Sequence, residues 1–222
     1  MQIDNTTLNF LKALKKNNNK DWFDLNRDKY AAAKTNHEEF VNAFIKEAAK
    51  LNKTIAGMDA KQCVFRIFRD VRFSKNKSPY KENFGAAISE GGRKSVKAGY
   101  YIHIEPGNNS FIGGGMWMPE GDVIKKVRQE IDYNIREFQK ILSEKKFKAL
   151  FGGLSDEYKL TNPPKGYDKS LPHIELLKYN SYIVGVDHIS DKEVLSPGFL
   201  KKAIEGYKVM LPLIHFLNTA LD

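Results

Sequence analysis

The residues best suited to chemistry lie in one basic segment, residues 66–81, which reads RIFRDVRFSKNKSPYK. Arginine makes planar, paired hydrogen bonds to phosphate or carboxylate, and lysine adds a point charge. The hydroxyl groups of Ser74, Ser78 and Tyr80 can complete a cradle for such an anion. The segment therefore predicts an anion-binding surface built on Arg66, Arg69, Arg72, Lys75, Lys77 and Lys81.

One acidic residue, Asp70, interrupts this segment between two arginines. We expect its carboxylate to hold a guanidinium in place rather than to take part in a reaction. A purely structural alternative stays open, in which the arginines pair with Asp70, with Glu105 or with the C-termini of helices.

Proton transfer is best assigned to a polar strand face that carries His103 and Glu105. These two are the first choice by elimination, because a histidine and a carboxylate can act as acid or base near neutral pH. Two aromatic residues, Tyr101 and Trp117, are expected to shape the pocket. No complete catalytic signature is present, so both an enzyme and a binding protein fit these residues.

No motif points to a cofactor or a metal ion. The glycines at 113–115 are followed by Met116 and Trp117, where a P-loop requires Gly-Lys-Ser/Thr. The five histidines are dispersed along the chain, and only a site assembled by folding from His103, Glu105 and His188 stays open. We therefore expect no cofactor and no metal.

Strands are predicted to position the basic segment and its neighbours. Residues 64–68, 84–89, 98–105, 110–117 and 181–189 carry the apolar and aromatic patterns of strands, separated by glycine, proline and asparagine. In the third of these, Tyr100, Ile102 and Ile104 are expected to face the core. Short successive strands indicate a mostly antiparallel sheet.

Helices are predicted on both sides of this strand region. The apolar spacing indicates helices over residues 5–16, capped by Asn5 or Thr6, and 21–51, with a bend near residues 35–36. Further helices are expected over residues 120–134 and 135–151, and from Ser196-Pro197 to about residue 221. The order predicts one α+β domain over residues 1–222, an antiparallel sheet flanked by N-terminal and C-terminal helices.

Composition narrows the class of protein. The net charge of +9 favours acidic partners. No apolar run approaches the roughly 18 residues of a membrane span, and residues 1–10 lack the features of a signal peptide. Cys63 is the only cysteine, so nothing requires an oxidising compartment. We expect a cytoplasmic protein that makes no membrane contact.

Three stretches of the chain resemble a family of conserved hypothetical proteins catalogued as domain of unknown function 2461. They are DWFDLNRDKY at residues 21–30, the basic segment continued to residue 83, and GYYIHIEP at 99–106 with GGGMW at 113–117. The family also tends to carry a GYDK element followed by a histidine before a proline. Here GYDK at residues 166–169 is followed by SLPH, so His173 comes after the proline and departs from that pattern. The resemblance implies an α+β domain and assigns no activity.

Our hypothesis from the sequence is a domain that binds, or binds and processes, a small phosphate- or carboxylate-bearing ligand. A nucleic-acid-binding module that uses the same basic segment is the first alternative. A protein-interaction domain is the second. The residues leave the oligomeric state open.

Overall fold

The computed structural model describes all residues, 1–222. Its first half begins with three helices, α1 (Asn5–Lys16), α2 (Lys20–Leu25) and α3 (Arg27–Ala48). Asp4, rather than Asn5 or Thr6, takes the N-cap position of α1, and Asn19 caps α2 by accepting a hydrogen bond from the backbone of Trp22. A short 3-10 helix, η1 (Lys53–Ile55), and α4 (Ala60–Cys63) follow.

The predicted bend near residues 35–36 is wrong, because α3 is continuous there and the break falls at Asn26, between α2 and α3. The side chain of Asn36 is buried, and the helix continues through this residue without a break. Its Oδ1 accepts hydrogen bonds from the backbone of Asp4 at 2.9 Å and the hydroxyl of Thr7 at 2.8 Å. This polar residue therefore joins α3 to α1.

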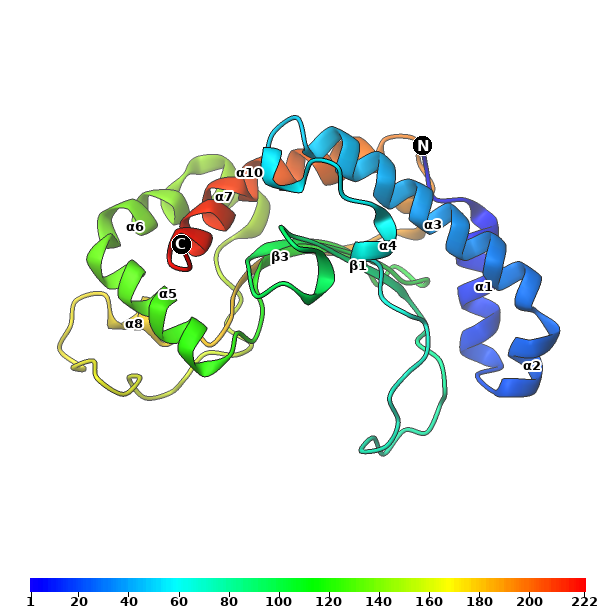
Figure 1. Cartoon of the computed structure of the whole chain (residues 1–222), viewed down its shortest axis with the longest axis horizontal. Coiled ribbons are helices and arrows are strands. Elements are labelled where there is room, and N and C mark those ends of the chain that lie inside the picture. The colour runs from blue at the N-terminus through cyan, green and yellow to red at the C-terminus, as the bar shows by residue number, and fades with distance from the viewer.

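Four antiparallel strands form one sheet in the order β1 (Phe84–Ile88), β2 (Gly99–Ile104), β3 (Ser110–Met116) and β4 (Tyr182–Ile189). A 3-10 helix, η2 (Gly92–Lys94), lies between β1 and β2. The α+β prediction, with an antiparallel sheet and helices at both ends, is confirmed. The α3 and α10 (Phe199–Thr219) helices lie along one face of this sheet (Figure 1).

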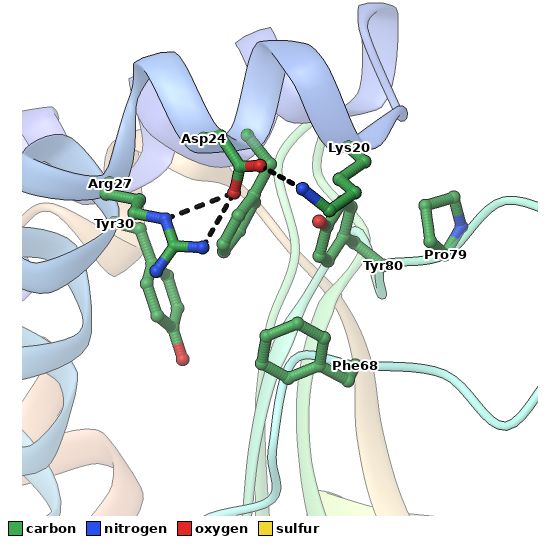
Figure 2. Close-up of a pocket in the computed structure, with 8 residues that line it drawn as sticks. Lys20, Asp24, Arg27, Tyr30, Phe68, Pro79 and Tyr80 are labelled. Carbon is green, nitrogen blue, oxygen red and sulfur yellow. Dashed lines mark hydrogen bonds and ion pairs between the residues drawn. The ribbon is translucent and has the colours of Figure 1, made fainter.

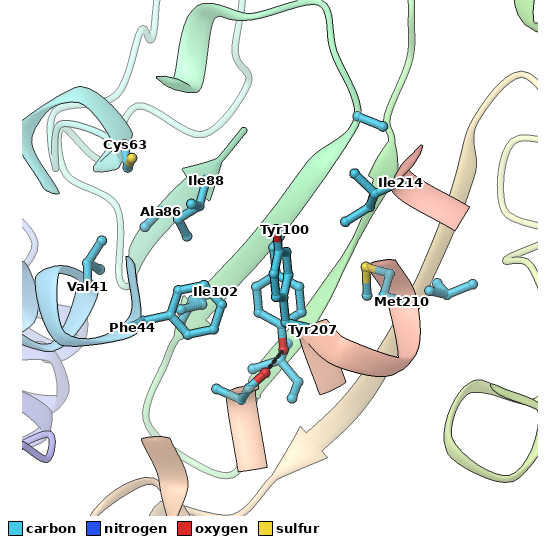
Figure 3. Close-up of a cluster of buried hydrophobic side chains, with 14 of the residues drawn as sticks. Val41, Phe44, Cys63, Ala86, Ile88, Tyr100, Ile102, Tyr207, Met210 and Ile214 are labelled. Carbon is cyan, nitrogen blue, oxygen red and sulfur yellow. Dashed lines mark hydrogen bonds between the residues drawn. The ribbon is translucent and has the colours of Figure 1, made fainter. Parts of the chain in front are cut away.

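The core lies between that sheet face and the two long helices. As predicted, Tyr100, Ile102 and Ile104 are buried there. Figure 3 shows the ring of Tyr100 with those of Phe44 and Tyr207, at centroid distances of 5.0 and 5.4 Å. The hydroxyl of Tyr100 donates to the carbonyl of Ala203 at 2.9 Å, so this buried polar group is satisfied.

The predicted strand over residues 64–68 is wrong. Only two isolated bridges form, Val64 with Ala86 and Phe68 with Tyr80. The chain leaves the edge of β1 after these contacts, and residues 69–78 extend away from the body as a projecting loop (Figure 1). This apolar run does not form a regular edge strand, because its backbone hydrogen bonds are divided between β1 and the base of the loop.

Between β3 and β4 lie α5 (Gly121–Tyr133), α6 (Ile135–Ser143), α7 (Lys145–Phe151) and α8 (Ile174–Leu177), and α9 (Asp191–Val194) follows β4. The last helix begins at Phe199, not at Ser196-Pro197, because Ser196 closes α9 through hydrogen bonds to the carbonyl of Glu193. Pro212 lies inside α10. None of these helices has the length and apolar character needed to cross a membrane.

Candidate ligand-binding pockets and the projecting loop

The projecting loop is braced from within by Arg69. Its guanidinium donates to the carbonyl of Ser78 at 3.2 Å and to the hydroxyl of Ser74 at 3.3 Å. Two of the residues predicted to bind ligand, Arg69 and Ser74, thus hold the two sides of the loop together.

At the tip of the loop, Asp70 holds Arg72 as the sequence predicted. The distances from Nε and Nη2 of Arg72 to the two carboxylate oxygens are 3.0 and 2.7 Å. These hydrogen bonds lower the pKa of Asp70. Lys77 donates to the carbonyl of Val71, and Lys75 is exposed without a partner. The tip cations therefore face solvent rather than a pocket.

Arg66 lies apart from the loop, in a pocket of about 290 Å³ that we call the basic pocket. The α3 helix forms one side of it, and the segment before β1 together with η2 forms the other. Its charged residues are Lys34, Glu38, Lys61, Arg66 and Arg93, and its remaining lining residues are Tyr30, His37, Val64, Phe65 and Phe84.

His37 is the buried polar residue of the basic pocket. Its side chain is 2% exposed and stacks on Phe84 at a centroid distance of 5.3 Å, and neither ring nitrogen has a hydrogen-bond partner in the protein. Burial lowers the pKa of His37 to about 4, and the backbone of Gly85, which lies near the ring but outside hydrogen-bond geometry, opposes this only in part. The imidazole is therefore neutral at pH 7 and offers one donor and one acceptor.

A second pocket, about 410 Å³, lies where α2 and the start of α3 meet the base of the loop. Figure 2 shows Tyr30 and Phe68 on its two sides, and we call it the aromatic pocket. The ring of Phe23 stacks on that of Tyr80 at 4.0 Å. The lining residues are Lys20, Phe23, Asp24, Arg27, Tyr30, Phe68, Pro79 and Tyr80.

An ion cluster borders the aromatic pocket. Asp24 pairs with both Lys20 and Arg27, the latter at 2.8 Å, and these hydrogen bonds lower its pKa (Figure 2). Because one carboxylate faces two exposed cations, the cluster keeps one net positive charge.

The proton-transfer candidates lie on the sheet face opposite the core. His103 Nε2 is 3.0 Å from Glu105 Oε2, and the imidazole stacks on Phe111 at 4.5 Å. Burial lowers the pKa of His103, although Glu105 opposes this shift. Burial also raises the pKa of Tyr101 to about 12. The His103–Glu105 pair is thus an organised hydrogen-bonded pair, but it lines neither pocket.

Lys81 lies between the basic pocket and this sheet face. Its Nζ is 5.2 Å from the centroid of the Phe65 ring, and burial, followed by repulsion from Arg66, lowers its pKa. The charge of Lys81 also disfavours protonation of His103. The fold therefore brings Arg66, Lys81 and His103 into one electrostatic neighbourhood.

Trp117 does not join this neighbourhood. It follows β3 at the end of the sheet where Gly115 pairs with Gly99, whereas the basic segment enters β1 at Phe84, which pairs with Ile104 at the opposite end. Its ring instead contacts that of Tyr158. No group of three or more histidine, cysteine, aspartate or glutamate side chains is placed to hold a metal ion.

Several pocket residues were missed in the sequence, notably Lys20, Asp24, Lys34, His37 and Arg93. One signal was available for α3, because Tyr30, Lys34 and His37 follow the spacing of one helix face. No local pattern relates that face to Arg93, which is more than fifty positions away.

The family model for conserved hypothetical proteins known as DUF2461 matches residues 6–216. The chain belongs to this family. The match spans both pockets, the projecting loop and the sheet, and it confirms the resemblance noted in the sequence. No curated protein and no solved structure matches the chain. Membership of DUF2461 thus brings no named activity with it.

Proposed function

We propose that this DUF2461 protein binds a small ligand bearing a phosphate or carboxylate group in the basic pocket. One observation carries the proposal: four basic side chains and a single acid surround a buried histidine that has no partner in the protein.

The charges of the basic pocket support an anion. Lys34 pairs with Glu38 at 3.3 Å, but none of the other three cations forms an ion pair. Arg93 donates one hydrogen bond, to the carbonyl of Lys61 at 2.7 Å, and its remaining donors are free. The three cations without an acidic partner are Lys61, Arg66 and Arg93.

His37 supports a ligand rather than a simple counterion. Buried polar groups in folded proteins are almost always hydrogen-bonded, so a neutral imidazole without a partner is expected to meet one from the ligand. Since the pKa of His37 is about 4, it can recognise either a hydroxyl or a carbonyl without adding charge.

The apolar lining and the volume of the basic pocket indicate what the rest of the ligand is like. Tyr30, Phe65 and Phe84 provide apolar surface, and the volume of about 290 Å³ lies at the small end for ligand pockets. A compact anion with a flat or apolar body fits best. We propose binding rather than catalysis, because the His103–Glu105 pair does not line this pocket.

A thermal-shift and calorimetry screen tests the proposal. The panel is inorganic phosphate, sugar phosphates, nucleoside monophosphates and aromatic carboxylates, and a ligand that binds only the folded state raises Tm. We expect one class to bind saturably, with affinity reduced at least tenfold in Arg66→Gln. The matched control is Arg136→Gln, which removes an equal charge from an exposed position on α6. If no compound binds, or if both variants lose affinity equally, the proposal fails.

A further inference from the structure

The projecting loop presents an aromatic ring to solvent among cations. The side chain of Phe73 is 96% exposed. The guanidinium carbon of Arg72 lies 5.8 Å from its ring centroid, and Lys75 and Lys77 follow within four residues. A single exposed apolar side chain is common on protein surfaces, but this one stands at the end of a braced loop among cations, and that combination indicates a partner surface.

The same combination recurs at the base of the loop. Phe68 is 47% exposed and faces Tyr30 across the aromatic pocket, where Lys20 and Arg27 supply the charge (Figure 2). Phe73 lies five residues further along the chain, at most roughly 17 Å away, because a turn from Val71 to Ser74 shortens this side of the loop. Two aromatic platforms thus occupy the two ends of one basic loop.

We infer that the projecting loop and the aromatic pocket bind single-stranded nucleic acid. One base stacks on Phe73 and a second enters between Phe68 and Tyr30, while Lys75, Lys77 and Lys20 contact phosphates. Proteins that hold single strands combine a basic track with aromatic rings on which bases stack. This surface is separate from the residues that carry charge in the basic pocket.

The arrangement favours an unpaired strand over a duplex. A ring that stands free at the tip of a loop can stack only on the face of a base, and those faces are covered inside a duplex. The aromatic pocket has the same requirement, because its apolar surface lies between two ring walls.

The arrangement also favours nucleic acid over an anionic membrane. Phe73 is the only exposed large apolar side chain at the tip, and its neighbours in the sequence include the polar residues Asp70, Ser74 and Asn76. The second ring, Phe68, contacts Phe23 and Tyr80 at the base and is directed into the pocket rather than outward. A bilayer would therefore receive a single ring.

Fluorescence anisotropy with a labelled 12-nucleotide oligothymidine and the same length of oligouridine tests the inference on the full chain. Phe73→Ala and Phe68→Ala should each weaken binding about tenfold, the scale of one lost stacking contact, while Phe73→Trp should retain it. The aromatic control is Tyr133→Ala, which removes a ring that is 73% exposed at the end of α5.

The charge arm compares Lys75→Gln/Lys77→Gln with Lys145→Gln/Lys146→Gln, an equal change on the exposed surface of α7. We expect weaker binding in the first pair only. For the wild type, a plot of log affinity against log salt concentration should have a slope of about −2, as three phosphate contacts to a single strand require. Equal loss in both pairs, equal affinity for duplex, unchanged binding in Phe73→Ala, or binding to phosphatidylserine vesicles but not to oligonucleotides would each overturn the inference.

Discussion

The guanidinium of Arg69 donates a hydrogen bond to the backbone carbonyl of Ser78 across the base of the projecting loop, at 3.2 Å. The same side chain reaches the hydroxyl of Ser74, so one residue joins three points of the loop. The backbone adds a bond from the amide of Arg69 to the carbonyl of Pro79 at 2.9 Å. The loop therefore projects as a braced hairpin rather than as a free chain.

We expect Arg69→Met to loosen this loop and leave the body of the protein intact. The variant keeps much of the aliphatic stem but removes both side-chain hydrogen bonds, each worth about 1 kcal/mol. Hydrogen exchange at residues 69–78 should accelerate, with Tm lowered by only a few degrees. Arg72→Met, at the exposed tip, should change exchange less, and a large drop in Tm for Arg69→Met would show that its role extends to the core.

We expect His37 to make stability depend on pH between its folded and unfolded pKa values. The folded pKa is about 4 and the ordinary value is 6.5, so the unfolded chain binds a proton that the folded chain excludes over this window. The contribution of His37 to the free energy of unfolding is therefore at its full value above about pH 6.5. It is lost as the pH is lowered, and the loss reaches about 2 kcal/mol at pH 5.

Urea unfolding of the wild type and His37→Leu at pH 7 and pH 5 measures this effect. The leucine variant has similar volume and cannot titrate, so its loss of stability over this interval should be smaller by that amount. The same slope in both proteins would place the acid sensitivity in other groups.

We expect Gly114→Ala to be strongly destabilising. A methyl group at this position would lie 2.3 Å from the backbone oxygen of Gly99 and 2.6 Å from the sulfur of Met210, and the former cannot move aside without disturbing the sheet. The cost should be about 3 kcal/mol or more. Gly121→Ala, with no atom within 4 Å of the added methyl, is the matched control and should leave the unfolding midpoint unchanged or slightly raised.

We expect Cys63 to be unreactive in the folded protein. It is fully buried at the end of α4, and burial raises the pKa of its thiol to about 11, so almost no thiolate is present at neutral pH. A thiol reagent such as dithionitrobenzoate should react only as fast as the protein opens, and rapidly in denaturant. Rapid stoichiometric labelling at pH 7 without denaturant would contradict this expectation.

A strand is easiest to predict from sequence when its alternation reflects one buried and one less buried face. β2 is the clearest example, because Tyr100 and Ile102 turn to the core while Tyr101 and His103 turn away. Residues 64–68 carry a comparable apolar content, yet their pairing depends on how β1 and the projecting loop divide the available hydrogen bonds. Composition alone does not encode that division.

The sequence located only part of the candidate site. The segment from Arg66 to Lys81 drew attention to anions, and the structure divides it among a braced loop, two pockets and a sheet face. Tyr30 and His37 share one face of α3, but what surrounds them in the basic pocket comes from segments far away in the chain. Tertiary contact, not local pattern, forms the basic pocket.

The ring of Tyr30 forms a wall of both the basic pocket and the aromatic pocket. A ligand that shifts this ring on entering one pocket changes the free energy of binding in the other. Linkage requires that the effect be mutual, so that each ligand alters the affinity for the other by the same factor. On the two proposals made above, this one tyrosine would couple the binding of a small anion to the binding of a nucleic-acid strand, as competitors or as partners.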